Sequence, residues 1–180
     1  MKDEKYFKNY IATIPNFPKE GIMFRDITPT LENADAFKET IDSMAELVSK
    51  YDFNKIICAD ARGFFFGSAL AYKLHKGLVS ARKPGKLPRP GLEYSYSLEY
   101  GKNTLVIPDN SLNENDRVLV VDDLLATGGS AVAMIELVKQ SKATPVAAIF
   151  YIELPDLKGV DFIKKAKDMP VHSLVKFEGE

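Results

Sequence analysis

The stretch "VLVVDDLLATGGS", residues 118–130, decides the fold of this chain. Four apolar residues, three of them valine, run directly into Asp122 and Asp123 and then into a Thr-Gly-Gly turn. A short run of this kind predicts a strand buried on both faces of a parallel sheet. The glycines and Ser130 lead into residues 130–141, "SAVAMIELVKQS", which we expect to form a helix. Paired carboxylates at the end of such a strand indicate a ligand site, because open α/β sheets bind ligands outside the carboxyl ends of their strands.

The segments on either side repeat this pattern. "KIICAD", residues 55–60, is a short β-branched run that predicts a buried strand, and "GSALAYKL", residues 67–74, suits a helix packed on it. Strand, glycine turn and helix thus occur at least twice in order, which predicts an α/β fold with a mainly parallel central sheet flanked by helices. Apolar residues at helical spacing predict one more helix over residues 36–51. Further strands are expected at residues 77–82, 144–154 and 171–177.

One insertion breaks the alternation of strand and helix. In "LEYSYSLEY", residues 92–100, leucines and tyrosines alternate strictly with glutamates and serines. A period of two is typical of a half-exposed antiparallel strand. Residues 101–103, Gly-Lys-Asn, are expected to turn this strand into "TLVIP" at residues 104–108. We therefore predict a small two-stranded antiparallel flap that projects from the sheet.

Length and composition limit the class of protein. We expect the 180 residues to form a single domain over 1–180, and a net charge of −1 argues against a field that attracts nucleic acid or an acidic membrane. Cys58, the one cysteine, cannot form an internal disulfide, and its apolar neighbours predict a buried core residue. No apolar stretch approaches the roughly 18 residues of a membrane span, and residues 1–10 lack the apolar core of a signal peptide. A cytoplasmic protein is the expectation.

The strand-acid-glycine junction predicts a sugar phosphate as the ligand. Glycines let successive backbone N–H groups turn toward one point, and the following helix N-terminus adds positive potential there, so Thr127 to Ser130 suit a phosphate. Two carboxylates would repel that phosphate, and hence we expect Asp122 and Asp123 to face vicinal sugar hydroxyls, with a divalent cation near them. The chain has neither GxxxxGK[ST] nor a GxGxxG after a strand. A helix-capping loop with solvated acids is the alternative.

The junction also resembles the phosphoribosyl pyrophosphate motif of type I phosphoribosyltransferases. Further blocks are similar, in the same order, to those of the adenine phosphoribosyltransferases: "NFPKEGIMFRDITP" (16–29), "ARGFFFG" (61–67), "RKPGKLP" (82–88), "YSLEYG" (96–101) and "IELPDLKG" (152–159). The resemblance implies the type I phosphoribosyltransferase fold and a reaction of purine salvage. In that reaction the phosphoribosyl group of phosphoribosyl pyrophosphate is transferred to adenine, with Mg²⁺, to give AMP and pyrophosphate. It also implies small-molecule substrates only and a homodimer.

The resemblance assigns roles to residues at each block. Asp122 and Asp123 would take the ribose hydroxyls. The 5-phosphate loop would consist of Ala126, Thr127, Gly128, Gly129 and Ser130. The pyrophosphate would be held by Arg62, Arg82, Lys83 and Lys86, partly across the dimer interface, with Arg62 also catalytic. Mg²⁺ would be held mainly through phosphoribosyl pyrophosphate, with no protein residue as a direct ligand.

The adenine site follows from the same resemblance. Phe24 and Leu154 would stack on the two faces of the base, and backbone groups of Met23 and Arg25 would read its amino edge. Glu99, on the polar side of the flap, would transfer a proton at the purine. Taken alone, each of these residues has a structural alternative. Core packing explains Phe24 and Leu154 equally well, and solvation of an edge strand explains Glu99. We expect Phe65 and Phe66 to be core residues.

Three rival interpretations stay open. The basic run at residues 82–89 could be a solvated loop or a weak nucleic-acid patch. A non-catalytic regulator can keep the fold and sense phosphoribosyl pyrophosphate or nucleotides. A transferase for a 6-oxopurine or for orotate would need different donors at the base. The "FRDI" and "SLEYG" blocks argue against the last of these. Two departures from the family pattern, Ser130 in place of threonine and Pro84 in the basic loop, remove no residue that the chemistry requires.

Overall fold

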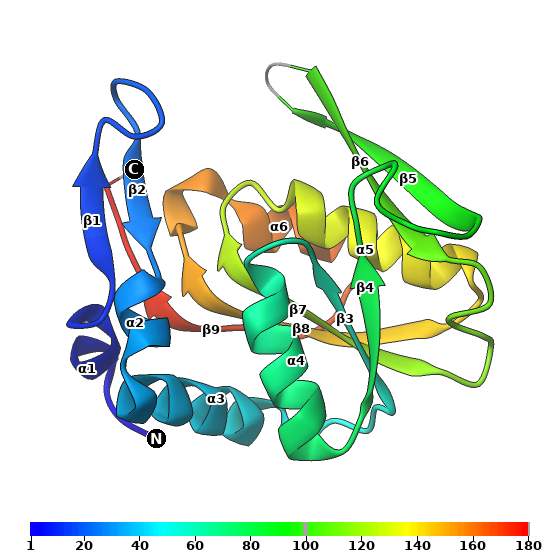
Figure 1. Cartoon of the computed structure of the whole chain (residues 1–180), viewed down its shortest axis with the longest axis horizontal. Helices are drawn as coiled ribbons and strands as arrows, with labels where there is room; N and C mark the ends of the chain where they lie inside the picture. The colour runs from blue at the N-terminus through cyan, green and yellow to red at the C-terminus, as the bar shows by residue number, and fades with distance from the viewer. Residues whose placement is uncertain (99–100, 180) are drawn as a thin grey trace.

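The structure is a computed structural model that describes residues 1–98 and 101–179 (Figure 1). At its centre is a five-stranded sheet in which all neighbouring strands are parallel. This confirms the predicted parallel sheet. In spatial order its strands are β4 (Gly77–Ala81), β3 (Lys55–Ala59), β7 (Arg117–Leu125), β8 (Thr144–Glu153) and β9 (Val171–Lys176).

Helices cover both faces of the sheet. α3 (Ala34–Val48) and α4 (Gly63–Leu74) pack on one face, and α5 (Gly129–Gln140) and α6 (Gly159–Ala166) pack on the other. Side chains of β7 alternate between two buried clusters. Val118 and Val120 contact the α5 side, while Leu119 and Val121 contact the α3 and α4 side. The unbroken apolar run of this strand therefore follows from burial on both faces. Among the described residues no helix is long and apolar enough to cross a membrane.

The N-terminal segment adds a hairpin that the sequence did not predict. α1 (Glu4–Lys8) is followed by β1 (Ala12–Pro15) and β2 (Met23–Asp26), which pair antiparallel, and then by α2 (Thr28–Glu32). In Figure 1 these blue elements lie to the left of the central sheet, where α1 contacts β9. A short 3₁₀ turn, η1 (Pro155–Leu157), follows β8. The Tyr151 hydroxyl joins the N-terminal segment to β8, since it lies 2.8 Å from Oγ1 of buried Thr30.

The predicted flap is present as β5 (Gly91–Leu98) paired antiparallel with β6 (Gly101–Pro108). Ser95 and Ser97 are exposed, whereas Tyr94 and Tyr96 pack against the core, as the alternation predicted. The predicted turn was wrong. Residues 101–103 belong to β6, because Gly101 pairs with Leu98 and the backbone ladder continues without a break to Pro108.

Two further expectations need correction. α4 begins at Gly63 and not near residue 67, so the three phenylalanines form its first turns. Phe66 is fully buried as predicted, but Phe65 is 49% exposed, because neighbouring residues on a helix point in different directions.

Cys58 is buried as expected, and burial raises the pKa of its thiol to about 12. That thiol is a packing group and not a nucleophile.

Candidate active site

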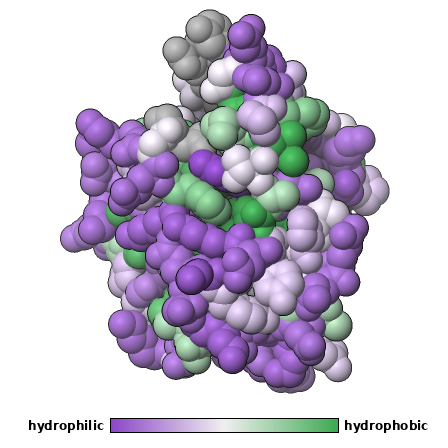
Figure 2. All heavy atoms as spheres, turned by 90° about the vertical axis from the view of Figure 1, so that its left-hand side faces the viewer, coloured by the Kyte–Doolittle hydropathy of each residue, from purple (hydrophilic) through white to green (hydrophobic). Residues whose placement is uncertain are grey.

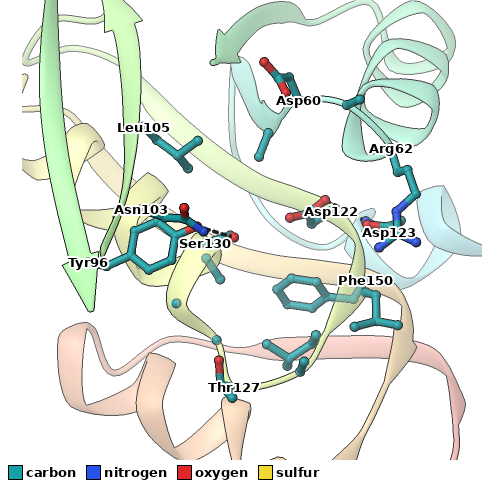
Figure 3. Close-up of a pocket in the computed structure, with 18 of the residues that line it drawn as sticks. Asp60, Arg62, Tyr96, Asn103, Leu105, Asp122, Asp123, Thr127, Ser130 and Phe150 are labelled. Carbon is teal, nitrogen blue, oxygen red and sulfur yellow. Dashed lines mark hydrogen bonds and ion pairs between the residues drawn. The ribbon is translucent and has the colours of Figure 1, made fainter. Parts of the chain in front are cut away.

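A cavity of about 460 Å³ opens beyond the carboxyl ends of β3 and β7 (Figure 3). The end of β3 and the segment after it contribute residues 59–62 to its wall, and the end of β7 with the start of α5 contributes residues 122–131. The flap closes one side with Tyr96 and residues 103–105, and Lys83 and Phe150 complete the lining. The position of this cavity agrees with the general rule for ligand sites in open α/β sheets.

The two acids of the junction lie inside the strand and not beyond it. β7 continues to Leu125, and both Asp122 and Asp123 are buried among its last four residues. The backbone N–H of Asp123 donates to Oδ1 of Asp122 at 2.9 Å. Burial, and then the charge of Asp123, raise the pKa of Asp122 well above its usual range. Burial also raises the pKa of Asp123, although Arg62 opposes this shift. The alternative of solvated acids is therefore wrong. A ligand that brings hydroxyl donors or a positive charge to this pair would stabilise the charged form of the two acids.

Glycines shape the loop that follows the acids. Gly128 has a φ of +89°, which L residues rarely adopt, and α5 begins at the next residue. A Cβ at Gly128 would lie 3.0 Å from the carbonyl oxygen of Gly159, so the backbone also leaves little room for a side chain. Residues 126–130 all line the cavity, and the N–H groups of the first turn of α5 have no partner within the helix. This is the geometry of an anion site at a helix N-terminus.

Arg62 lies between the acids and a second cavity. Its Nε is 2.9 Å from Oδ2 of Asp123, and its guanidinium carbon is 5.1 Å from the centre of the Phe24 ring. The N–H does not point at the carboxylate oxygen, and Oδ2 of Asp123 accepts no hydrogen bond from the described residues. The contact is thus an ion pair that leaves a buried acceptor available for a ligand. Arg62 itself is 40% exposed.

The second cavity has a volume of about 580 Å³ and a mostly apolar lining. Figure 2 shows apolar side chains gathered in the middle of an otherwise polar face, on the side of the molecule that carries the β1–β2 hairpin. Phe24, from β2, is half-buried and meets Phe17 edge-on, with ring centres 5.1 Å apart. Arg62 lines both cavities. The full lining comprises Ile14, Phe17, Phe24, Asp26, Ile27, Thr28, Leu31, Arg62 and Phe65.

Three other residues predicted for the base, Met23, Arg25 and Leu154, do not line this cavity. Met23 is partly exposed, and Nη1 of Arg25 donates to Oγ1 of Thr13 at 2.6 Å. Leu154 is only 6% exposed and packs in the core on the α3 and α4 side of the sheet. Its N–H donates to the carbonyl oxygen of Leu125, which fixes it beside the end of β7. Glu99 lies outside the described residues.

The basic loop is held at the rim of the main cavity by an acid that the sequence did not single out. The backbone N–H of Lys83 donates to Oδ2 of Asp60 at 3.3 Å, and Nε of Arg82 lies 3.5 Å from the same oxygen. Nη1 of Arg82 donates to the carbonyl oxygen of Lys86. Of the three basic residues only Lys83 lines the cavity, and Lys86 is exposed. The structure thus places this loop at the edge of the main cavity, with Arg82 and Lys86 outside the cavity lining.

Sequence reasoning missed several residues of the two cavities. Tyr96 and Asn103 reach the main cavity from the flap, Asp60 stands at its rim, and Phe17 lines the apolar cavity. The alternation of the flap strand contained the signal for Tyr96, because it sets this residue on the inward face with Tyr94. Phe17 carried no periodic signal, since it lies in the loop between two short strands.

Comparisons with known proteins agree with this geometry. Residues 30–169 match the model of the phosphoribosyl transferase domain. The adenine phosphoribosyltransferase of Fervidobacterium nodosum is 48% identical over 170 residues, which cover 94% of this chain and 98% of that protein. The crystal structure of the adenine phosphoribosyltransferase from Thermoanaerobacter pseudethanolicus is 44% identical, with a TM-score of 0.92 and coverage of 96% and 99% of the two chains.

A third similar protein was solved with ligands. The Saccharomyces cerevisiae adenine phosphoribosyltransferase, complexed with D-2,5-dideoxy-2,5-imino-altritol 1,6-bisphosphate and adenine, is 36% identical, with a TM-score of 0.86. The match covers 95% of this chain and 97% of the yeast chain. The buried acids before a glycine loop, the adjoining aromatic cavity and the similarity over nearly the whole chain all indicate the same family. The chain therefore belongs to the phosphoribosyltransferase family, and within it to the adenine phosphoribosyltransferases.

Proposed function

We propose that this chain transfers the 5-phosphoribosyl group of phosphoribosyl pyrophosphate to adenine, which gives AMP and pyrophosphate in purine salvage. One observation carries the proposal. A cavity with two buried acids and a glycine loop adjoins an apolar cavity with an aromatic wall, and Arg62 lines both. The first suits a sugar phosphate and the second suits a flat base, so the bond between base and sugar forms near Arg62. We further propose that residues 1–180 act as one domain.

In the sugar-phosphate cavity, Asp122 and Asp123 accept hydrogen bonds from the ribose hydroxyls. The 5-phosphate occupies the loop formed by Ala126, Thr127, Gly128, Gly129 and Ser130, where backbone N–H groups and two hydroxyls donate to it. Oδ2 of Asp123 supports this assignment, because it is buried and accepts no hydrogen bond from the described part of the chain. A ribose hydroxyl supplies the missing donor.

Cations meet the charge that develops on the leaving pyrophosphate. Arg62, Lys83, Arg82 and Lys86 are assigned to this task, with Lys83 at the cavity wall and the other loop residues at its rim. A divalent cation nearby would offset the mutual repulsion of these two buried carboxylates, and one of their oxygens is unpartnered within the described residues. We propose that Mg²⁺ is held mainly through phosphoribosyl pyrophosphate. Within residues 1–98 and 101–179 no three potential metal ligands cluster. The ion supplies charge neutralisation and orients the pyrophosphate.

Adenine is assigned to the apolar cavity. Phe24 stacks on one face of the base, and the yeast relative, which was solved with adenine, supports a base site in this fold. Leu154 is assigned to the opposite face and the backbone of Met23 and Arg25 to the amino edge. Because Leu154 is buried and does not line the cavity, this assignment requires a small rearrangement when adenine binds. Glu99 is assigned to proton transfer at the purine.

We also propose that the enzyme is a cytoplasmic homodimer. Large side chains are exposed on α4 and on the edge strand β4: Tyr72 (90%) and Leu78 (42%). A partner that covers them would remove this apolar surface from water. Sedimentation equilibrium tests the dimer, and Tyr72→Asp is expected to weaken it. A monomer at micromolar concentration excludes this assembly.

The test of the reaction uses purified protein with Mg²⁺, phosphoribosyl pyrophosphate and one base: adenine, hypoxanthine, guanine or orotate. We expect AMP and pyrophosphate from adenine alone, with strong losses in Glu99→Ala and Asp123→Ala. The second candidate is a regulator that binds phosphoribosyl pyrophosphate or nucleotide without catalysis. Measurable binding with no turnover of any base supports that candidate and overturns the enzyme.

A further inference from the structure

The flap touches the phosphate loop through one side chain. The Tyr96 hydroxyl lies 3.0 Å from Oγ of Ser130, the last residue of the loop, and both residues line the main cavity (Figure 3). Tyr96 pairs across the flap with Asn103, whose side chain also faces this cavity. Tyr94, two residues earlier on the same face of β5, packs against the core and does not line the cavity.

The same tyrosine explains the second glycine of the Thr-Gly-Gly turn. Gly129 is the first residue of α5 and, unlike Gly128, has no positive φ. Its backbone therefore does not require glycine. A Cβ at this position, however, would lie 2.7 Å and 2.8 Å from two carbons of the Tyr96 ring. The absent side chain makes room for the ring, and the ring on Gly129 sets the tyrosine hydroxyl beside Ser130.

The chemistry of the two hydroxyls fixes the direction of the contact once a phosphate is bound. A serine hydroxyl has one hydrogen and can rotate, so by itself it is a weakly oriented donor. A phosphate dianion only accepts hydrogen bonds. If the tyrosine O–H donates to Oγ of Ser130, the serine hydrogen is left to point at the phosphate, and successive hydrogen bonds of this kind strengthen one another.

We propose that Tyr96 is a positioning residue for the 5-phosphate: its hydroxyl donates to Ser130 and orients the serine hydroxyl toward the phosphate. This inference rests on the proposed function, because it takes the 5-phosphate of phosphoribosyl pyrophosphate and AMP as the ligand of the loop. It adds a residue from the flap to the phosphate site. It also links the base of the flap to the loop, so the substrate phosphate stabilises both.

The test compares Tyr96→Phe, which keeps the ring on Gly129, with Tyr94→Phe as the matched control. The Kd of AMP, measured by calorimetry, is expected to rise about fivefold in Tyr96→Phe, the usual effect of one hydrogen bond, and to stay unchanged in Tyr94→Phe. The KM of phosphoribosyl pyrophosphate is expected to rise by a similar factor with little change in kcat. Inhibition by inorganic pyrophosphate, which does not occupy the loop, is expected to stay the same.

A second comparison separates action through Ser130 from direct contact. In a Ser130→Ala background, the further change Tyr96→Phe is expected to alter the Kd of AMP by less than about twofold. A further rise of about fivefold in the Kd of AMP there shows that Tyr96 contacts the phosphate itself, and it overturns the proposal. The proposal is also overturned if Tyr96→Phe weakens inhibition by pyrophosphate to the same extent, or if Tyr94→Phe raises the Kd of AMP equally. AMP binding needs no turnover. A wild-type protein that binds AMP but makes none therefore overturns the proposed function and leaves this comparison intact.

Discussion

Nε of Arg62 lies 2.9 Å from Oδ2 of Asp123, and the same guanidinium lies over the ring of Phe24. A single cation therefore contacts the acid assigned to the ribose and the aromatic wall assigned to the base. Its pairing lowers the pKa of Asp123 against the larger effect of burial. Since Arg62 is at the N-cap position of α4, directly after the turn that leaves β3, the sheet fixes its backbone and leaves the side chain free to reach either cavity.

Arg62→Lys keeps the charge and removes the planar fork. We expect kcat/KM for phosphoribosyl pyrophosphate to fall about 100-fold, because an ammonium group cannot contact the acid, the ring and the leaving pyrophosphate together. Steady-state kinetics with adenine measures this loss. Arg89→Lys, at an exposed position that lines neither described cavity, is the control and should be unaffected. A loss below threefold in Arg62→Lys would show that the arginine acts only as a charge.

Phe24→Leu tests the base site. An aromatic face contributes about 0.5–1.5 kcal/mol beyond its buried area, so we expect the KM of adenine to rise up to about tenfold. The KM of phosphoribosyl pyrophosphate should change little, since Phe24 does not line the sugar-phosphate cavity. Phe24→Tyr retains the ring and should stay within about twofold of wild type. Equal effects on both substrates would place Phe24 in the structural framework and not in the base site.

Local pattern predicted the central fold because burial on both faces leaves a direct signal. The apolar run of β7 and the alternation of β5 were enough to identify a parallel sheet and an antiparallel flap. Residues 101–103 misled the prediction, since glycine and asparagine favour turns but here pair with Leu98 to Tyr96 across the ladder. The β1–β2 hairpin gave no signal, because none of the residues in its four-residue strands is fully buried and the strands lack a regular apolar pattern.

The site was predictable where its residues are neighbours in sequence. Asp122, Asp123 and the glycine loop follow one another, so one motif placed them together. Contacts between distant segments were not predictable, because they depend on how the sheet packs its elements. Examples are Asp60 holding the loop of Arg82 and Lys83, and the ring of Tyr96 on Gly129.

Gly128→Ala tests the backbone of the phosphate loop. The positive φ costs an L residue about 1–2 kcal/mol, and the contact of a Cβ with the Gly159 carbonyl adds to this. We expect the free energy of unfolding, measured with urea, to fall by about 2–3 kcal/mol. Gly21→Ala is the matched control, because Gly21 has a φ of +87° with no atom within 4 Å of the added Cβ. It should cost only the 1–2 kcal/mol, roughly, of the positive φ. Equal losses would mean that the Gly159 contact relaxes freely.

Asp122→Asn tests whether the two buried acids, which are assigned to ligand binding, lower the free energy of unfolding of the protein. Burial and the charge of Asp123 raise the pKa of Asp122, so the folded state holds this proton more tightly than the unfolded state does. As the pH rises from about 3.8, the ordinary value, the unfolded state loses its proton first and the folded state loses stability until the folded pKa is passed. The penalty therefore grows as the pH rises above about 3.8 and is complete once the pH has passed the folded pKa.

The amide keeps an oxygen to accept the N–H of Asp123 and carries no charge, so Asp122→Asn removes the penalty without changing shape. We expect the free energy of unfolding at pH 7 to rise by about 1–2 kcal/mol, and its decline with pH above about 3.8 to flatten relative to wild type. Turnover should fall about 100-fold or more, because a ribose hydroxyl loses its charged acceptor. Asp52→Asn, at an exposed position, is the control and should leave stability and turnover unchanged. If Asp122→Asn lowers the free energy of unfolding and leaves its pH dependence unaltered, the buried carboxyl stabilises the fold. The acid pair then does not reduce stability in favour of ligand binding.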